Sequence, residues 1–152
     1  YHTVVTSAAG YPLDKTYYQT VKGMVGAIDI LEPGGTLIIV SECSEGIGSD
    51  EYVLAQKRLT ENGPRGFLQS IQEKPLADID EWQTQMQTKA MEGGRIYLYS
   101  ELTPEQQSLT GVESVDDVDQ AIRRSFDESD CGSVAVIPEG PYVIPYVGNK
   151  MP

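Results

Sequence analysis

Short β-branched runs and longer stretches with helical spacing alternate along the chain. Residues 2–8 (HTVVTSA) form a β-branched run that predicts a strand. Between residues 16 and 31, apolar side chains recur at helical spacing, which predicts an amphipathic helix ended by the Pro-Gly-Gly sequence at 33–35. Residues 35–42 (GTLIIVSE) are almost continuously apolar, as in a strand whose two faces are both covered in a parallel sheet. This order predicts the start of a βαβα fold.

The later part of the chain continues the alternation around a helical insertion. A second helix is expected to start near Ser49 or Asp50, and the stretches at 64–74 and 80–94 also have helical character. Because no strand pattern separates them, we expect a helical insertion around residues 49–92. The remaining predicted elements are a strand at 95–101, a helix in 113–126 whose capping pattern is Ser114 with Asp117, a strand at 132–140 and an extended end at 141–147.

Together these elements predict an α/β protein, a three-layer Rossmann-like sandwich with a mostly parallel sheet. At 152 residues the chain has the length of one ordinary domain, so residues 1–152 are interpreted as a single domain. The chain begins with Tyr1 and enters the first strand at once, so we expect a piece of a longer protein.

Charge and cysteine content narrow the classes of function. The formal net charge of −12 repels phosphate backbones and anionic lipid surfaces, so we expect neither nucleic acid nor a membrane as a partner. Cys43 and Cys131 lack a CxxC spacing, and we interpret both as buried thiols of a cytoplasmic protein. His2 is the one histidine, so this chain cannot assemble a multi-histidine metal site, and we expect no metal ligands.

The first predicted helix carries three polar side chains on one flank. At about 100° per residue, Tyr18, Gln19 and Lys22 fall next to one another beside the apolar stripe. A phenol, an amide and an amine can therefore converge on one small molecule near the positive end of the helix. Any half-exposed helix flank can carry such a set, so spacing alone leaves both interpretations open. The position after the first strand favours a site, because open α/β sheets bind ligands beyond the carboxyl ends of their strands.

The sequence around this flank is more specific than its spacing. Residues 6–24 (TSAAGYPLDKTYYQTVKGM) and 30–49 (ILEPGGTLIIVSECSEGIGS) resemble the carboxy-terminal domain of the nickel-dependent lactate racemase family, whose enzymes use a nickel-pincer nucleotide. A GGYP-x-D pattern followed by a YQxxK helix is characteristic of that family. The resemblance is dense over residues 3–50 and looser afterwards. Ala9 stands where the family usually has the first glycine of the pair, and its methyl group restricts the backbone of that turn.

The resemblance implies the carboxy-terminal half of a 2-hydroxy acid racemase or epimerase. In such enzymes the α-hydrogen of the substrate leaves as hydride to the pincer ring and returns to the other face of the ketoacid. The nickel-binding and proton-transferring histidines are implied to lie in an amino-terminal domain of the same polypeptide. The resemblance therefore implies that the amino-terminal domain binds most of the nickel-pincer nucleotide. It also implies that the present chain, taken alone, is inactive.

Four residues receive roles from the resemblance. Lys22 and Gln19 are implied to face the active site as catalytic residues, with Lys22 holding the substrate carboxylate. Tyr18 is implied to line the same pocket, and Trp82 is implied to approach the cofactor from the helical region. Trp82 also begins an i, i+4, i+8 series with Met86 and Ala90, which equally describes the core face of a helix.

A second class of function stays open. A chain with one histidine and no metal ligands could equally be a module on the same fold that binds a small anion or a nucleotide without chemistry. The loop at 43–49 (CSEGIGS) resembles a phosphate-binding loop, but it lacks the lysine of a P-loop and the full GxGxxG fingerprint. We interpret it as a tight turn beside the cleft, with Ser44, Glu45 and Ser49 at the border and Cys43 in a packing role.

Overall fold

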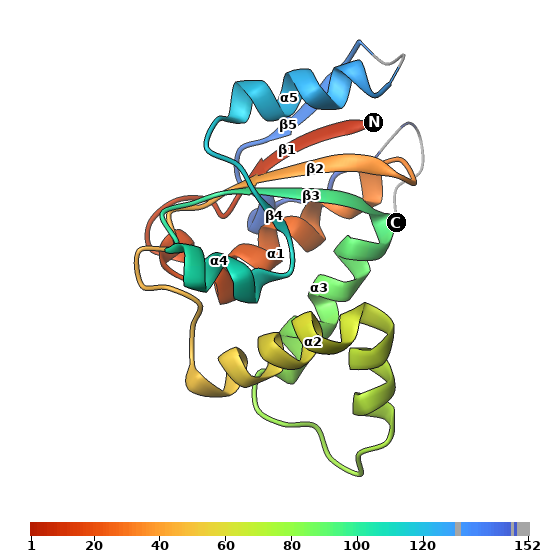
Figure 1. The fold of residues 1–152 in the computed structure, drawn as a ribbon. Coiled ribbons are helices and arrows are strands. Elements are labelled where there is room, and N and C mark those ends of the chain that lie inside the picture. Colours follow the sequence, from red (N-terminus) through yellow and green to blue (C-terminus); the bar gives the residue numbers. More distant parts are fainter. Residues whose placement is uncertain (130–131, 147, 149–152) are drawn as a thin grey trace.

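Five parallel strands form one sheet in the order β4-β3-β2-β1-β5 (Figure 1). The computed structural model describes residues 1–129, 132–146 and 148. The helices and strands are β1 (Thr3–Ser7), η1 (Leu13–Lys15), α1 (Tyr17–Ala27), η2 (Ile28–Ile30), β2 (Gly35–Val40), α2 (Asp50–Gln72), α3 (Glu81–Gly93), β3 (Gly94–Tyr99), α4 (Pro104–Thr110), β4 (Glu113–Ser114), α5 (Val118–Asp127), β5 (Val134–Ile137) and η3 (Gly140–Tyr142). The predicted α/β class with a parallel sheet is confirmed.

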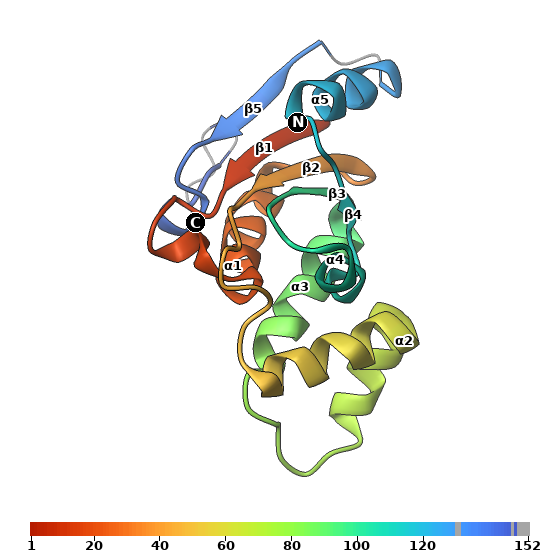
Figure 2. The same ribbon diagram turned by 60° about the vertical axis from the view of Figure 1, so that its left-hand side comes forward.

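The strands send alternate side chains to two covered faces of the sheet. Val5, Ile38 and Tyr97 lie in register on β1, β2 and β3 and pack against α5. Their neighbours Val4 and Leu37 point to the opposite face, which α1 and α3 cover. Figure 2 shows α5 on one side of the sheet and α1 and α3 on the other. The predicted three layers are therefore present.

The helical insertion lies between β2 and β3 and extends away from the sheet (Figure 1). It starts where expected, because the Ser49 side chain caps α2 by accepting a hydrogen bond from the amide of Tyr52. The predicted helical stretch at 64–74 is present as the second segment of α2. Gly63, with a φ of 69° and a ψ of 172°, leaves the helical conformation, so α2 consists of two helical segments and the second begins at Pro64.

Two predictions between β3 and α5 are wrong. The predicted map lacks α4, which starts with a capping box between Thr103 and Gln106. Ser114 does not cap the next helix, because it belongs to β4, which pairs with β3. Asp117 is the cap instead, and its carboxylate accepts a hydrogen bond from the amide of Gln120 at 3.0 Å. Pairing with the sheet thus decides the conformation of this segment.

The last part of the chain is only partly extended. The predicted strand at 132–140 is β5, but the segment expected to be extended from residue 141 begins inside the short helix η3. Residues 143–146 form no regular element, and Val147 lies outside the described residues, as does Cys131. No helix in the part of the chain described here combines the length and apolar character needed to cross a membrane.

The turn after β1 holds Ala9 in a conformation that favours glycine. Ala9 has a φ of 67° and is followed by Gly10 at 71°. A left-handed alanine costs roughly 1–2 kcal/mol, while an added glycine costs roughly 0.5–1 kcal/mol of unfolded-state entropy. We expect Ala9→Gly to raise the free energy of unfolding by about 0.5–1 kcal/mol in urea denaturation. Gly10→Ala, which meets no atom within 4 Å, should lower it; equal or opposite shifts would contradict the strain at Ala9.

Candidate functional site

The first amides of α1 are all bonded within the protein. Thr16 caps the helix, its side chain accepting from the amide of Gln19 at 3.4 Å and its carbonyl accepting from the amide of residue 20. The amides of Tyr17 and Tyr18 each donate at 2.9 Å to carbonyls of residues 46–47 in the loop after β2. The positive end of the helix therefore has no free N–H group for a ligand, so an anion at this site needs a side-chain cation.

Lys22 supplies a cation one turn into α1. Its Nζ lies 5.6 Å from the centroid of the Tyr18 ring, as expected for an i, i+4 pair. The side chain is half-buried and does not enter the core. In the described part of the chain the ammonium has no ion-pair partner, and the ring is its one specific contact. An unpaired, partly desolvated cation is available to an anionic ligand.

Tyr18 joins this cation to two other aromatic rings. Its ring meets Tyr52 edge to face at 5.0 Å between centroids, and it meets Trp82 in the same manner at 6.2 Å. Tyr52 is fully buried, whereas Trp82 is 51% exposed. The interpretation of Trp82 as part of a helix core face is therefore wrong. The structure brings Tyr18, Lys22 and Trp82 together, from two helices far apart in the sequence.

Gln19 takes no part in the ring contacts of this cluster. Its Oε1 is buried and has no hydrogen-bond partner among the described residues. A buried acceptor without a donor costs roughly 1–3 kcal/mol. Gln19 is thus not part of the ring cluster, but its carbonyl oxygen can accept a hydrogen bond from a donor that approaches α1.

A cavity of about 420 Å³ opens beside Tyr18. Its lining residues are Thr16, Tyr18, Glu45, Gly48, Ser49 and Asp80, so Gln19, Lys22 and Trp82 do not line it. Glu45 and Ser49, which were expected at the border of the substrate cleft, line this cavity, whereas Ser44 takes no part in its lining. Gly48 allows the loop after β2 to lie close to Tyr18, because a Cβ at position 48 would be only 3.1 Å from the Cβ of Tyr18.

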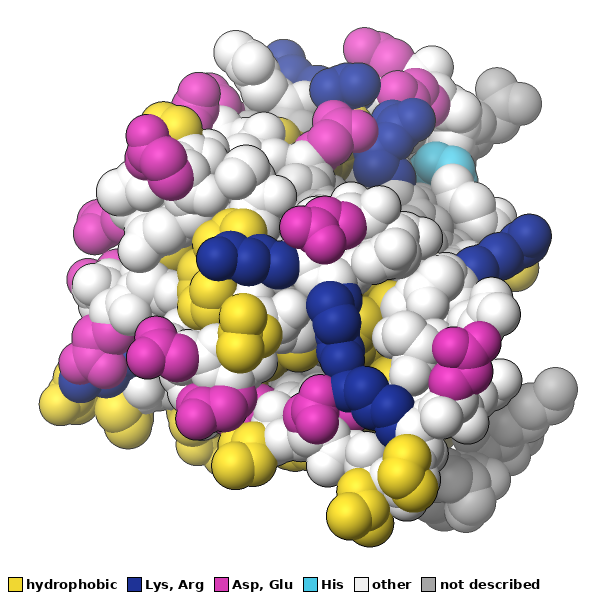
Figure 3. Space-filling model, turned by 60° about the horizontal axis from the view of Figure 1, so that its bottom comes forward, with side chains coloured by type: hydrophobic (Ala, Val, Ile, Leu, Met, Phe, Trp, Pro, Cys, Tyr) yellow, Lys and Arg dark blue, Asp and Glu magenta, His cyan; other side chains and the backbone are white. Residues whose placement is uncertain are grey.

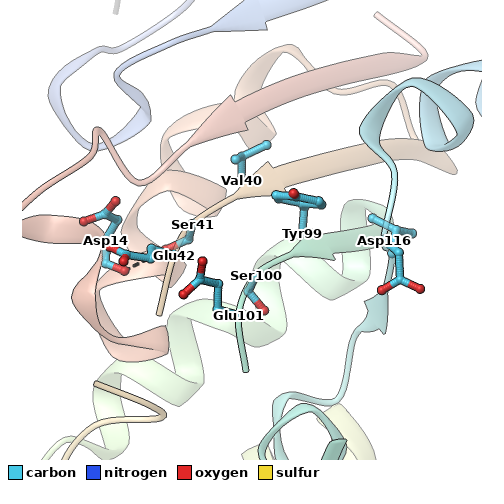
Figure 4. A pocket seen from close by; sticks show the side chains of 9 residues that line it. Asp14, Val40, Ser41, Glu42, Tyr99, Ser100, Glu101 and Asp116 are labelled. Atoms are coloured by element: carbon cyan, nitrogen blue, oxygen red, sulfur yellow. Dashed lines mark hydrogen bonds between the residues drawn. The ribbon is translucent and has the colours of Figure 1, made fainter. Parts of the chain in front are cut away.

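Sequence reasoning missed a second cleft, at the carboxyl ends of β2 and β3 (Figure 4). It has a volume of about 440 Å³ and is lined by Asp14, Val40, Ser41, Glu42, Tyr99, Ser100, Glu101, Val115 and Asp116. Four of these side chains are carboxylates, which repel a carboxylate or phosphate ligand. The only feature that could have predicted this cleft from the sequence is its place at the carboxyl ends of the strands. Its negative charge does not suit an anionic substrate.

The surroundings of Cys43 agree with the predicted packing role. The Cys43 thiol is buried and lies 3.4 Å from the hydroxyl groups of Thr20 and Ser41, and burial raises the pKa of the thiol. A raised pKa keeps the thiol protonated and unreactive, as expected for a packing role. Within residues 1–129, 132–146 and 148, no group of three or more His, Cys, Asp or Glu side chains could hold a metal ion.

Known proteins resemble this chain in sequence and fold. Residues 2–145 match the family described as the lactate racemase C-terminal domain. The chain belongs to this family. The lactate racemase of Lactiplantibacillus plantarum is 30% identical over 144 residues, which cover 92% of this chain and 34% of that protein. The lactate racemase of Thermoanaerobacterium thermosaccharolyticum is 28% identical over 100 residues, which cover 64% of this chain and 23% of that protein.

The structural comparison agrees with the sequence comparisons. The structure of the lactate racemase apoprotein from T. thermosaccharolyticum matches 94% of this chain and 35% of its own, with a TM-score of 0.82 and 25% identity. The chain thus spans about a third of the length of these relatives, 34% of one protein and 35% of the solved structure. The resemblance stated above is confirmed as family membership, and the roles of Lys22, Gln19, Tyr18 and Trp82 remain predictions.

Proposed function

We propose that this chain is the substrate-orienting carboxy-terminal domain of a two-domain 2-hydroxy acid racemase. Its relatives named above are lactate racemases, and lactate is a 2-hydroxy acid. One observation carries the assignment: the half-buried ammonium of Lys22 lies over the Tyr18 ring without an acidic partner among the described residues. In a chain of net charge −12, such a cation suits a small carboxylate.

Each residue of the flank has a role in holding the substrate. Lys22 donates a charge-assisted hydrogen bond to the carboxylate. Gln19 accepts a hydrogen bond through its unpaired Oε1, for which the substrate hydroxyl is a suitable donor. The rings of Tyr18 and Trp82 form an apolar wall that keeps water from the reacting carbon. The chain therefore contributes binding, orientation and exclusion of water.

The cofactor belongs mainly to the rest of the polypeptide. When bound, the family's nickel-pincer nucleotide supplies the group that takes and returns the α-hydrogen. The described residues offer no cluster of three or more nickel ligands, so these residues do not fit a resident nickel ion by themselves. The half-exposed indole of Trp82 is the one flat surface of the ring cluster that this chain can offer to the cofactor.

We propose that the face formed by α2 and α3 contacts an amino-terminal domain of the same polypeptide. Figure 3 views the molecule from the side of α2 and α3, and apolar side chains are spread over that face among charged ones. Leu54, Leu76 and Ile79 are exposed near Trp82 in sequence or on the facing helix. Large exposed apolar side chains that cluster on one face commonly mark a contact surface.

The alternative of an anion or nucleotide binding module has no support from the loop at 43–49. The amides that such a site would use at the start of α1 are bonded to this loop. Asp50 and Glu51 occupy the first turn of α2, and their charges repel a phosphate at that helix end.

The test is stereochemical and uses the full-length protein loaded with its cofactor. A single enantiomer of lactate, and then of other 2-hydroxy acids, should become a mixture of both enantiomers on chiral chromatography. Substrate deuterated at C2 should keep its deuterium in both enantiomers, because a returned hydride does not exchange with water. Unchanged enantiomers with every 2-hydroxy acid would overturn the proposal, and loss of deuterium to water would overturn hydride transfer.

A further inference from the structure

The residues that open α3 contact both α1 and α2. Asp80 precedes the helix, and its Oδ2 accepts a hydrogen bond from the Ser49 hydroxyl at 2.7 Å. The Gln83 side chain donates from Nε2 to the backbone carbonyl of Tyr18 at 2.8 Å. Trp82 lies between them in sequence and meets the Tyr18 ring. The start of α3 therefore connects the candidate site on α1 to residues far away in the sequence.

Asp80 does not do what an aspartate before a helix usually does. An N-cap aspartate normally accepts a hydrogen bond from an amide in the first turn of its own helix. Asp80 makes no such bond, and its backbone is left-handed, with a φ of 61°. Its carboxylate turns instead to Ser49, the residue that caps α2. The Asp80 side chain therefore does not cap α3 and instead links the start of α3 to the start of α2.

The same carboxylate lies beside Tyr18. Both side chains line the cavity of about 420 Å³. Burial raises the pKa of the Tyr18 phenol, and the charge of Asp80 and its hydrogen bond with the phenol raise the pKa further. The phenol O–H is therefore suitably placed to donate to the Asp80 carboxylate. The face of the ring is what Tyr18 offers to Lys22.

A separate network of ion pairs and a hydrogen bond holds Glu81, the residue after Asp80. Glu81 is buried, pairs with Arg58 and Lys74, and accepts a hydrogen bond from the amide of Asp78 at 2.9 Å. The helix start therefore remains anchored when Asp80 is changed, and a variant at Asp80 tests the site more than the fold.

We propose that Asp80 is a positioning residue of the candidate site. It ties the Tyr18 hydroxyl to the cap of α2, so that the Tyr18 ring lies under the Lys22 ammonium and against Trp82. The assignment of these three residues to a substrate pocket rests on the proposed function, whereas the positioning itself does not.

The variants separate the carboxylate from the unusual backbone. Asp80→Gly removes the side chain and suits a φ of 61° without strain. Asp80→Asn keeps an oxygen that can accept from Ser49 and Tyr18, and asparagine also tolerates the left-handed region. Asp29→Gly and Asp29→Asn are matched controls, because Asp29 is exposed and follows the far end of α1.

The first readout is spectroscopic and needs no activity. The chain contains one tryptophan and buries a continuous core of its own, so Trp82 reports on the site in this domain. Asp80→Gly should displace the indole N–H resonance and shift the tryptophan emission, while Asp80→Asn and both Asp29 variants should stay near the unsubstituted protein. An unchanged indole resonance in a folded Asp80→Gly protein would overturn the proposal.

The second readout uses the cofactor-loaded full-length enzyme. We expect Asp80→Gly to lower kcat/KM about three- to tenfold, the range of one lost hydrogen bond, and Asp80→Asn to restore most of it. Tyr18→Phe combined with Asp80→Gly should lose no more than the larger single effect, because both remove one contact; additive losses would overturn the proposal. An enzyme without racemisation but with a displaced indole resonance would reject the proposed function and keep the positioning role.

Discussion

Lys22→Ala is expected, under the proposed function, to lower kcat/KM for racemisation by the full-length protein about 10- to 150-fold while leaving the fold intact. The variant removes the proposed charge-assisted contact with the substrate carboxylate, which is worth about 1.5–3 kcal/mol. It removes little packing, because Lys22 is half-buried and its one specific contact among the described residues is the Tyr18 ring. The measurement is racemisation kinetics with cofactor loaded, together with thermal unfolding of the same preparations.

Two further variants make the result specific to Lys22. Lys89→Ala removes an exposed lysine of α3 and should change neither kcat/KM nor the melting temperature. Gln19→Ala should cost less than Lys22→Ala, because a neutral amide makes weaker hydrogen bonds than an ammonium. If Lys22→Ala keeps a near-normal kcat/KM, or loses activity only in step with a lower melting temperature, the flank is a solvated helix face.

The sheet and its main helices could be predicted because their signals are local. A strand covered on both faces is apolar at successive positions, as in β2, and α1 repeats its buried side chains at helical spacing. The sequence of α4 carries a proline and a capping box, but seven residues are too few for a convincing period. The two-residue strand β4 has no pattern of its own and depends on pairing with β3.

The same distinction applies to the candidate site. Tyr18 and Lys22 are four residues apart on one helix, so their contact follows from helix geometry alone. The positions of Trp82 and Asp80 depend on how the turn after α2 folds back, which no local period describes. The family resemblance suggested Trp82, but nothing in the sequence signals the left-handed backbone of Asp80 or its turn away from α3.

Gly23 lies where α1 packs closely against the sheet, and its replacement should strongly destabilise the protein. A Cβ at this position would lie 2.6 Å from the carbonyl oxygen of Ser7 and 2.9 Å from Cδ1 of Ile39. The backbone of β1 cannot rotate away as a side chain can, so α1 must lift from the sheet. We expect Gly23→Ala to lower the free energy of unfolding by about 3 kcal/mol and the melting temperature by roughly 6–12 °C.

Gly93→Ala distinguishes this steric effect from helix propensity. Gly93 ends α3, and a Cβ there would meet only Leu31, at an ordinary 3.7 Å. Propensity alone predicts that alanine stabilises both helices by up to about 1 kcal/mol, so the two variants should move in opposite directions in urea and thermal unfolding. Because Gly23 follows Lys22, lifting α1 should also reduce racemisation at temperatures where the variant is folded. A Gly23→Ala protein as stable as the original would show that α1 does not depend on this close approach.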